Sequence, residues 1–240
     1  GPPMSVDVIL AEVIADADGT LHAGGFGVDS AAGVSEHDFW DAYYLTSATG
    51  EQWTEPLNIS SVAGVANTID LAFDAQGRLH FLWTDPDYHD SLESQKSAIW
   101  ERVHNGVAWG PNVEVQVENP DPAINGASLT ADEQGTLHLG WSEGVISRTL
   151  DATVHLDLDV YYRAGDGQSW GEVEKVYTST VDSRYPVVAL SYETPYVVWQ
   201  EIYPGESALL EQEVYISSRD VVEPPLAYFL PFVAKHANVD

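Results

Sequence analysis

The chain has 240 residues, no Cys, and 38 acidic residues against 9 basic ones, which gives a formal net charge of −29. A surface this acidic repels the phosphates of nucleic acids and anionic membranes, so we expect neither as a partner. No apolar run approaches the roughly 20 residues that span a bilayer, whereas eight Trp and twelve Tyr indicate a packed protein.

A sequence repeat with a period of 58 residues organises the chain. The pattern Asp-x-x-Gly-x-Leu-His occurs at Asp16–His22, Asp74–His80 and Asp132–His138. A fourth, decayed copy occupies Ser191–Trp199. Trp83, Trp141 and Trp199 follow at the same interval. Four occurrences in register predict a repeat protein.

Each repeat predicts four short strands in chain order. The first strand is expected at Thr68–Phe73, Ala127–Thr130 and Pro186–Ser191, and the Gly of the turn after it supplies the positive φ of a tight hairpin. The second strand is Leu-His-x-x-Trp. The third is expected at Asp41–Tyr44, Ala98–Trp100, Asp159–Tyr162 and Glu213–Tyr215, and the fourth begins at Trp53, Trp109 and Trp170. In the last repeat Pro224 takes the Trp position and Leu226–Val233 replaces the strand.

These features predict an all-β fold, a β-propeller of four-stranded antiparallel blades with four blade repeats in the chain. We expect one domain over residues 5–235, with blades at about 5–60, 61–118, 119–180 and 181–235. The opening Gly1-Pro2-Pro3-Met4 is typical of the residue left by a tag-cleaving protease, so residues 1–4 are expected to lie outside the domain. The ends of the chain are expected to meet without sharing a blade.

Hairpins between the third and fourth strands resemble those of the sialidase-like propellers with Asp-box (BNR) repeats. That family has Ser/Thr-x-Asp-x-Gly-x-x-Trp at this place. Thr46–Trp53 keeps the Thr, Gly and Trp but has Ala48 for the Asp, while Asn105–Trp109 and Asp166–Trp170 keep only the Gly and Trp. The resemblance covers nearly the whole chain, and it implies the fold with degenerate boxes on the face opposite the ligand site.

Sialidase activity is not expected, because it needs an arginine cluster to clamp the substrate carboxylate. The blade frame puts Arg78, Arg102, Arg163 and Arg219 at the bottom face, which carries the hairpins. Only Arg148 and Arg184 fall at the opposite, top face, where they remain candidate ligand-binding residues.

Three carboxylates repeat two residues after the second-strand Trp, at Asp85, Glu143 and Glu201. A ring would place them at equivalent heights near the top face. One hypothesis is a binding site for a cation or polyol, or a carboxylate pair for glycoside hydrolysis. The alternative is that each accepts framework hydrogen bonds, as repeated residues commonly do.

Calcium is a possible ligand of the acidic loop at Asp85, Asp87 and Asp90, because oxygen atoms recur at alternating positions there. A solvated loop is the alternative. His22, His80 and His138 lie in mid-strand between apolar residues, which favours hydrogen-bonded core imidazoles over metal ligands.

The sequence thus predicts a non-catalytic binding propeller that uses an acidic top face for a glycan, a cation or a protein. The alternatives are a glycan-active hydrolase with top-face carboxylates, and a structural propeller whose self-assembly is its main property. The final Tyr228–Val233 is similar to tails of exported bacterial proteins, so an extracellular or cell-surface location is expected. A monomer and a homodimer with an eight-bladed ring both remain open.

Overall fold

A computed structural model describes residues 7–28, 40–60, 66–86, 97–119, 123–148, 154–192, 194–203, 211–218 and 226–228. It contains four antiparallel sheets of four strands each, and in every sheet the strands are ordered as they follow in the chain. Blade 1 consists of β1 (Asp7–Ala15), β2 (Leu21–Val28), β3 (Asp41–Ser47) and β4 (Leu57–Asn58). Blade 2 consists of β5 (Asn67–Phe73), β6 (Leu79–Pro86), β7 (Ser97–His104) and β8 (Val113–Val115).

The second half of the chain repeats this order. Blade 3 consists of β9 (Ala123–Ala131), β10 (Leu137–Arg148), β11 (Val154–Gly165) and β12 (Glu174–Tyr177). Blade 4 consists of β13 (Asp182–Ser191), β14 (Thr194–Tyr203), β15 (Glu211–Ser218) and β16 (Leu226–Tyr228). The predicted all-β propeller of four blades is confirmed, and no blade contains strands from both ends of the chain.

The fourth strand of blades 1, 2 and 3 begins later than the sequence indicated, whereas that of blade 4 begins at the predicted Leu226. In blades 1, 2 and 3 it begins four residues after Trp53, Trp109 and Trp170. Trp109 and Trp170 form only single bridges, to His104 and Gly165. The prediction that this strand starts at the Trp is therefore wrong, because the chain leaves the hairpin through an irregular segment before the ladder resumes.

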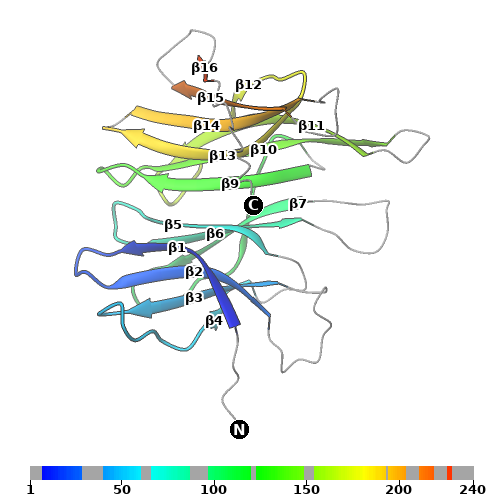
Figure 1. Cartoon of the computed structure of the whole chain (residues 1–240). Coiled ribbons are helices and arrows are strands. Elements are labelled where there is room, and N and C mark those ends of the chain that lie inside the picture. The colour runs from blue at the N-terminus through cyan, green and yellow to red at the C-terminus, as the bar shows by residue number, and fades with distance from the viewer. Residues whose placement is uncertain are drawn as a thin grey trace, which may run out of the picture.

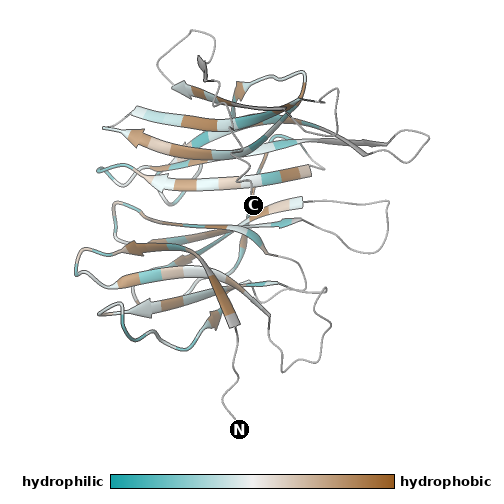
Figure 2. Cartoon of the chain, viewed as in Figure 1, coloured by the Kyte–Doolittle hydropathy of each residue, from teal (hydrophilic) through white to brown (hydrophobic). Residues whose placement is uncertain are grey.

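The blades pack face to face around a common centre. Figure 1 shows blades 1 and 4 at the two ends of the arrangement, with β5 and β9 between β1 and β13. Strands of consecutive blades pack extensively, while no such packing joins strands of blade 4 to blade 1 in the described part of the chain. Figure 2 shows apolar residues spaced along the strands, and the largest buried side chains include the repeated Trp83, Trp141 and Trp199. Burial of these indoles between blades supplies much of the apolar stabilisation.

A repeated hydrogen bond links each inner strand to the next. Glu12 of β1 accepts from the Leu71 N–H of β5 through Oε2. Asp70 Oδ2 accepts from the Leu129 N–H of β9 at 2.7 Å, and Ser128 Oγ accepts from the Val188 N–H of β13 at 3.2 Å. We call these three contacts the inter-blade latch. In each of these three interfaces, a side chain of the earlier blade accepts a hydrogen bond from a backbone N–H of the next blade.

The latch ends at blade 4, where the cross-strand register puts Val187 at the position of Glu12, Asp70 and Ser128. Val187 is 55% exposed and has no side-chain acceptor. At the other end of the arrangement Val13 is 45% exposed, whereas Leu71, its equivalent in blade 2, is 2% exposed. The end blades therefore differ from the inner ones in both polarity and burial.

Candidate functional site

The three repeated histidines each join a turn to the third strand of their own blade. His80 lies with Nδ1 2.7 Å from Glu101 Oε1 and Nε2 3.1 Å from Asp74 Oδ2. His22 and His138 lie with Nδ1 2.6 Å from the hydroxyls of Tyr44 and Tyr162. These contacts support the predicted role as hydrogen-bonded core imidazoles.

Two of the repeated carboxylates, Glu143 and Glu201, are fully buried. Glu143 accepts from Trp141 Nε1 at 2.9 Å and from the backbone N and side-chain Nδ2 of Asn119 at 3.0 and 2.8 Å. Burial raises the pKa of Glu143, and the donors oppose that rise. Asn119 belongs to the segment between blades 2 and 3, so this carboxylate fastens the connection between two blades.

Glu201 has the same arrangement one blade later. It accepts from Trp199 Nε1 at 2.6 Å and from Ser183 Oγ at 2.5 Å, and it also contacts the hydroxyl of Ser179. Buried acids with several donors favour the framework interpretation of Glu143 and Glu201, which the sequence left open. Asp85, at the same repeat position, is half-buried on β6.

The predicted calcium loop is described only in part. Asp85 lies within β6, while Asp87 and Asp90 lie outside the described residues. Among the residues that are described, no group of three or more His, Asp or Glu side chains could hold a metal ion. The calcium site therefore stays a prediction.

Of the two top-face arginines, only Arg184 has a described side chain. Its Nη2 lies 2.7 Å from Asp182 Oδ2 on the same strand, while Arg148 is the last residue of β10. Arg102 and Arg163 donate to backbone carbonyls of the hairpins and of the preceding blade, including Ile59 O and Gln116 O. These two guanidinium groups therefore stabilise the contact between consecutive blades.

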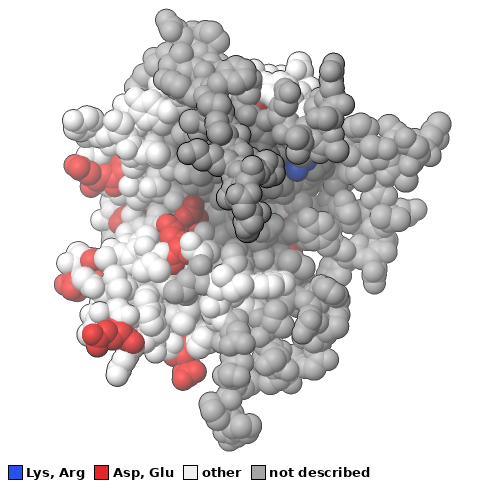
Figure 3. All heavy atoms as spheres, viewed as in Figure 1, with Lys and Arg blue, Asp and Glu red and all other residues white. Residues whose placement is uncertain are grey.

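The inner strands of all four blades surround one cavity of about 590 Å³, which we call the axial cavity. Sequence reasoning missed it. Its described lining comprises residues 67–70, 126–130 and 185–188 together with Ala11, Glu12 and Phe26. No Lys or Arg is among them. Figure 3 shows separate patches of Asp and Glu on the described surface and little Lys or Arg.

Glu12 and Asp70 form a carboxyl pair in the wall of this cavity. Burial raises the pKa of Glu12 from 4.5 to about 9, and its hydrogen bond to Asp70 acts in the same direction. Burial also raises the pKa of Asp70. The pair consequently holds a proton at neutral pH and presents less negative charge than two carboxylates would.

Tyr185 is an exposed aromatic side chain in the same wall. It is 54% exposed, and its backbone has φ of +53°, a conformation that is costly for a bulky residue. A bulge interrupts β13 between Arg184 and Val187, and it turns this residue out of the regular pleat. Strained residues of this kind gather at functional sites.

Removing the ionisable carboxyl group of Glu12 should change how the stability of the protein depends on pH. A carboxyl whose pKa is raised on folding contributes stability that is complete below its unfolded pKa, and this contribution is lost as pH rises through the folded value. The stability that the Glu12 carboxyl group contributes therefore falls as the pH rises from about 4.5 to 9. We expect Glu12→Gln to flatten that part of the profile, as measured by urea unfolding at pH 5, 7 and 9. The exposed Glu51→Gln is the control, and an unchanged slope in Glu12→Gln would show that the pair does not hold a proton.

Comparisons with known proteins support the fold and nothing finer. No protein-family model and no curated protein sequence matches the chain. Similar solved structures include an α-L-arabinanase of Penicillium chrysogenum complexed with arabinobiose, at 13% identity and a TM-score of 0.62, covering 95% of this chain and 68% of that one. A Dyadobacter fermentans protein of unknown function matches at 14% identity and a TM-score of 0.58, covering 91% and 63%.

A Trypanosoma rangeli sialidase in complex with the inhibitor DANA matches at 12% identity and a TM-score of 0.60, covering 88% of this chain and 36% of that chain. This chain thus spans less than two thirds of the Dyadobacter and Trypanosoma proteins. Its structural neighbours are sialidase and arabinofuranosidase β-propellers, and its fold is that of a sialidase-like β-propeller. Within the described residues, no helix has the length and apolar character that a membrane crossing requires.

Proposed function

We propose that this protein is a non-catalytic binding propeller whose axial cavity receives a neutral oligosaccharide. The observation that carries the proposal is the exposed, strained Tyr185 in the wall of a 590 Å³ cavity. That volume lies within the ~300–1,000 Å³ of typical ligand pockets. An aromatic face beside polar groups suits a sugar, which has both apolar C–H faces and hydroxyls.

The charge of the wall favours a neutral ligand over an anionic one. The described lining has no Lys or Arg to pair with a carboxylate, and the raised pKa values of Glu12 and Asp70 leave a pair with reduced negative charge whose oxygen atoms can accept a hydrogen bond from a hydroxyl. A sialic acid would meet a chain with net charge −29 and a described cavity lining without Lys or Arg to hold its carboxylate.

Binding without hydrolysis is proposed because of the geometry of the carboxyl pair. Glycosidases place their two carboxyl groups about 5–5.5 Å or 6.5–9.5 Å apart, so that the scissile bond fits between them. Glu12 and Asp70 hydrogen-bond to each other, and both also hold the latch to the next blade. Because the two carboxyl groups are in direct contact, a glycosidic oxygen has no room between them.

Titration with arabinobiose, the disaccharide found with one structural neighbour, tests this proposal. We expect saturable binding by calorimetry and no cleavage products by chromatography. Tyr185→Ala should weaken binding about tenfold, or roughly 1.4 kcal/mol, because the ring face is lost. Tyr192→Ala is the matched control, since Tyr192 is an exposed residue with positive φ in the turn after β13 and does not line the cavity.

Equal loss of affinity in both variants would contradict a specific role for Tyr185. Cleavage of the disaccharide would favour the hydrolase alternative, and N-acetylneuraminic acid binding more tightly than arabinobiose would contradict the preference for neutral sugars.

A further inference from the structure

Two of the hairpin tryptophans enter the interface with the preceding blade. Trp109 of blade 2 packs edge-on against Tyr44 of blade 1, with ring centroids 4.9 Å apart at 78°. It also packs against Phe81, at 6.2 Å and 80°. The Arg102 guanidinium lies 6.0 Å from its ring centroid. The indole is thus held by a ring of the preceding blade, a second-strand side chain and a guanidinium.

Blade 3 repeats this arrangement. Trp170 Nε1 donates to Glu101 Oε2 of blade 2 at 3.4 Å, and Arg163 lies 5.8 Å from the indole centroid. In the ladders, Arg102 is opposite Phe81 and Arg163 is opposite Leu139. The indole and the guanidinium therefore recur together from blade to blade.

The described third strand of blade 4 has a serine at the position of this guanidinium. The ladder places Ser217 opposite Val197, at the position that Arg102 and Arg163 occupy in the two preceding blades. The sequence has Pro224 at the predicted Trp position, which lies outside the described residues. A serine in place of an arginine leaves space at this end of the interface between blades 3 and 4.

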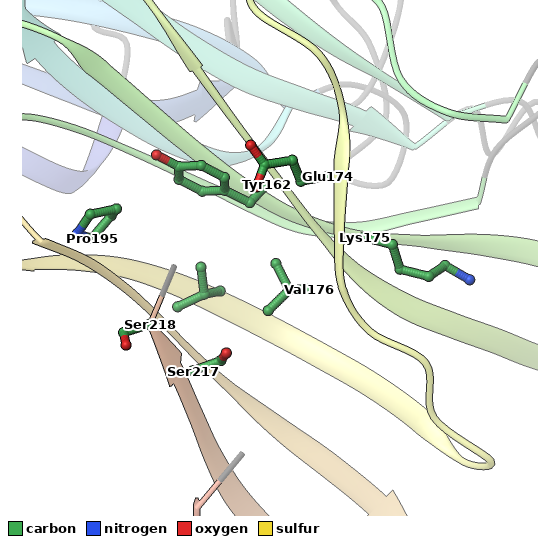
Figure 4. Close-up of a pocket in the computed structure, with 8 residues that line it drawn as sticks. Tyr162, Glu174, Lys175, Val176, Pro195, Ser217 and Ser218 are labelled. Atoms are coloured by element: carbon green, nitrogen blue, oxygen red, sulfur yellow. The ribbon is translucent and has the colours of Figure 1, made fainter. Parts of the chain in front are cut away.

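A pocket of about 190 Å³ occupies that space. Figure 4 shows Tyr162, Val176, Pro195, Ser217 and Ser218 around it, together with the charged Glu174 and Lys175. Its Tyr162 corresponds to Tyr44, since each hydroxyl lies 2.6 Å from the Nδ1 of the histidine in its own blade. The side chain of Val197, also in the lining, corresponds to Phe81. The two walls that hold Trp109 therefore recur around this pocket.

We infer that the pocket between blades 3 and 4 binds a tryptophan side chain of a partner polypeptide. The equivalent places in blades 2 and 3 of the same chain each hold an indole, and Tyr162 and Val197 of the pocket take the places of Tyr44 and Phe81 around Trp109. The partner's indole is flanked by basic residues, because the chain carries 38 acidic residues against 9 basic ones. This site goes beyond the proposed function, because it shares no lining residue with the axial cavity.

The test is titration of the full chain with a Lys-Trp-Lys tripeptide, followed by NMR. We expect saturable binding, and no binding of Lys-Ala-Lys, which has the same charge without the indole. Filling the pocket from β15 with Ser217→Phe should weaken the tripeptide at least tenfold. Ser191→Phe is the control, since Ser191 is exposed on blade 4 and outside the pocket.

A second measurement does not depend on any variant folding. In the complex of the unchanged protein, nuclear Overhauser effects should connect the indole protons to methyl groups of Val176 and Val197. Equal binding of the two tripeptides, undiminished binding to a folded Ser217→Phe, or absence of these effects at saturation would each overturn the proposal.

Discussion

Gly135→Ala should destabilise the protein by about 4 kcal/mol. Gly135 has φ of +75°, and a Cβ there would lie 2.0 Å from the backbone N of Ala75 in the turn of blade 2. Left-handed backbone costs an L-residue about 1–2 kcal/mol, and overpacking against a neighbour adds about 1–3 kcal/mol. Urea unfolding monitored by Trp fluorescence measures the loss.

Gly77→Ala is the matched control for that prediction. Gly77 occupies the same place in the turn of blade 2 with φ of +69°, but a Cβ there would meet nothing within 4 Å. Only the backbone cost remains, so we expect a loss of about 1 kcal/mol. Equal losses at the two glycines would mean that the turns of blades 2 and 3 do not touch as the structure has them.

Glu143→Ala should lower the free energy of unfolding by about 3 kcal/mol, because it leaves the Trp141 indole N–H and both Asn119 donors without their buried acceptor. Thermal and urea unfolding of the purified variant measure this. The exposed Glu133→Ala, in the turn of the same blade, is the control and should change stability by less than about 0.5 kcal/mol.

This result also separates the two hypotheses for the repeated carboxylates. Removing a framework acid lowers the free energy of unfolding of the protein. Removing a ligand-binding acid at the surface lowers the affinity for the ligand and changes the stability little. A Glu143→Ala protein as stable as the Glu133→Ala control would contradict the framework role and favour the ligand-binding one.

Much of the fold could be predicted from the sequence, because a repeat of 58 residues reports the same local chemistry several times. The Asp-x-x-Gly turns and the Leu-His-x-x-Trp strands lie where their pattern indicates. The start of the fourth strand was misplaced because Trp109 packs against the preceding blade rather than extending a ladder. A pattern within one repeat does not reveal a contact made between two repeats.

The same limit applies to the site. Glu12, Asp70 and Ser128 form the latch at regular spacing, yet they differ in residue type, so no motif marks them. Tyr185 contributes to the axial cavity through a bulge, and bulges are set by the pairing of whole strands. In contrast, the polar partners of the buried histidines were foreseeable, because a mid-strand imidazole needs them.

Several predictions from the sequence stay predictions. The acidic loop with Asp87 and Asp90 lies outside the described residues, as does most of the acidic top face. Self-assembly also stays open. Val187 and Val13 are apolar and exposed, which favours contact of the end blades with another surface. Such a contact would differ from the interfaces between inner blades, because Val187 has no acceptor for the latch hydrogen bond. Native mass measurement distinguishes a 26.2 kDa monomer from a dimer.

The most direct test of the central proposal is a crystal structure of the protein soaked in arabinobiose. We predict electron density for an intact disaccharide in the axial cavity, with one sugar face against the Tyr185 ring and a hydroxyl within hydrogen-bonding distance of the Glu12–Asp70 pair. An empty axial cavity at a concentration that saturates binding in solution, or a cleaved sugar within it, would contradict the account.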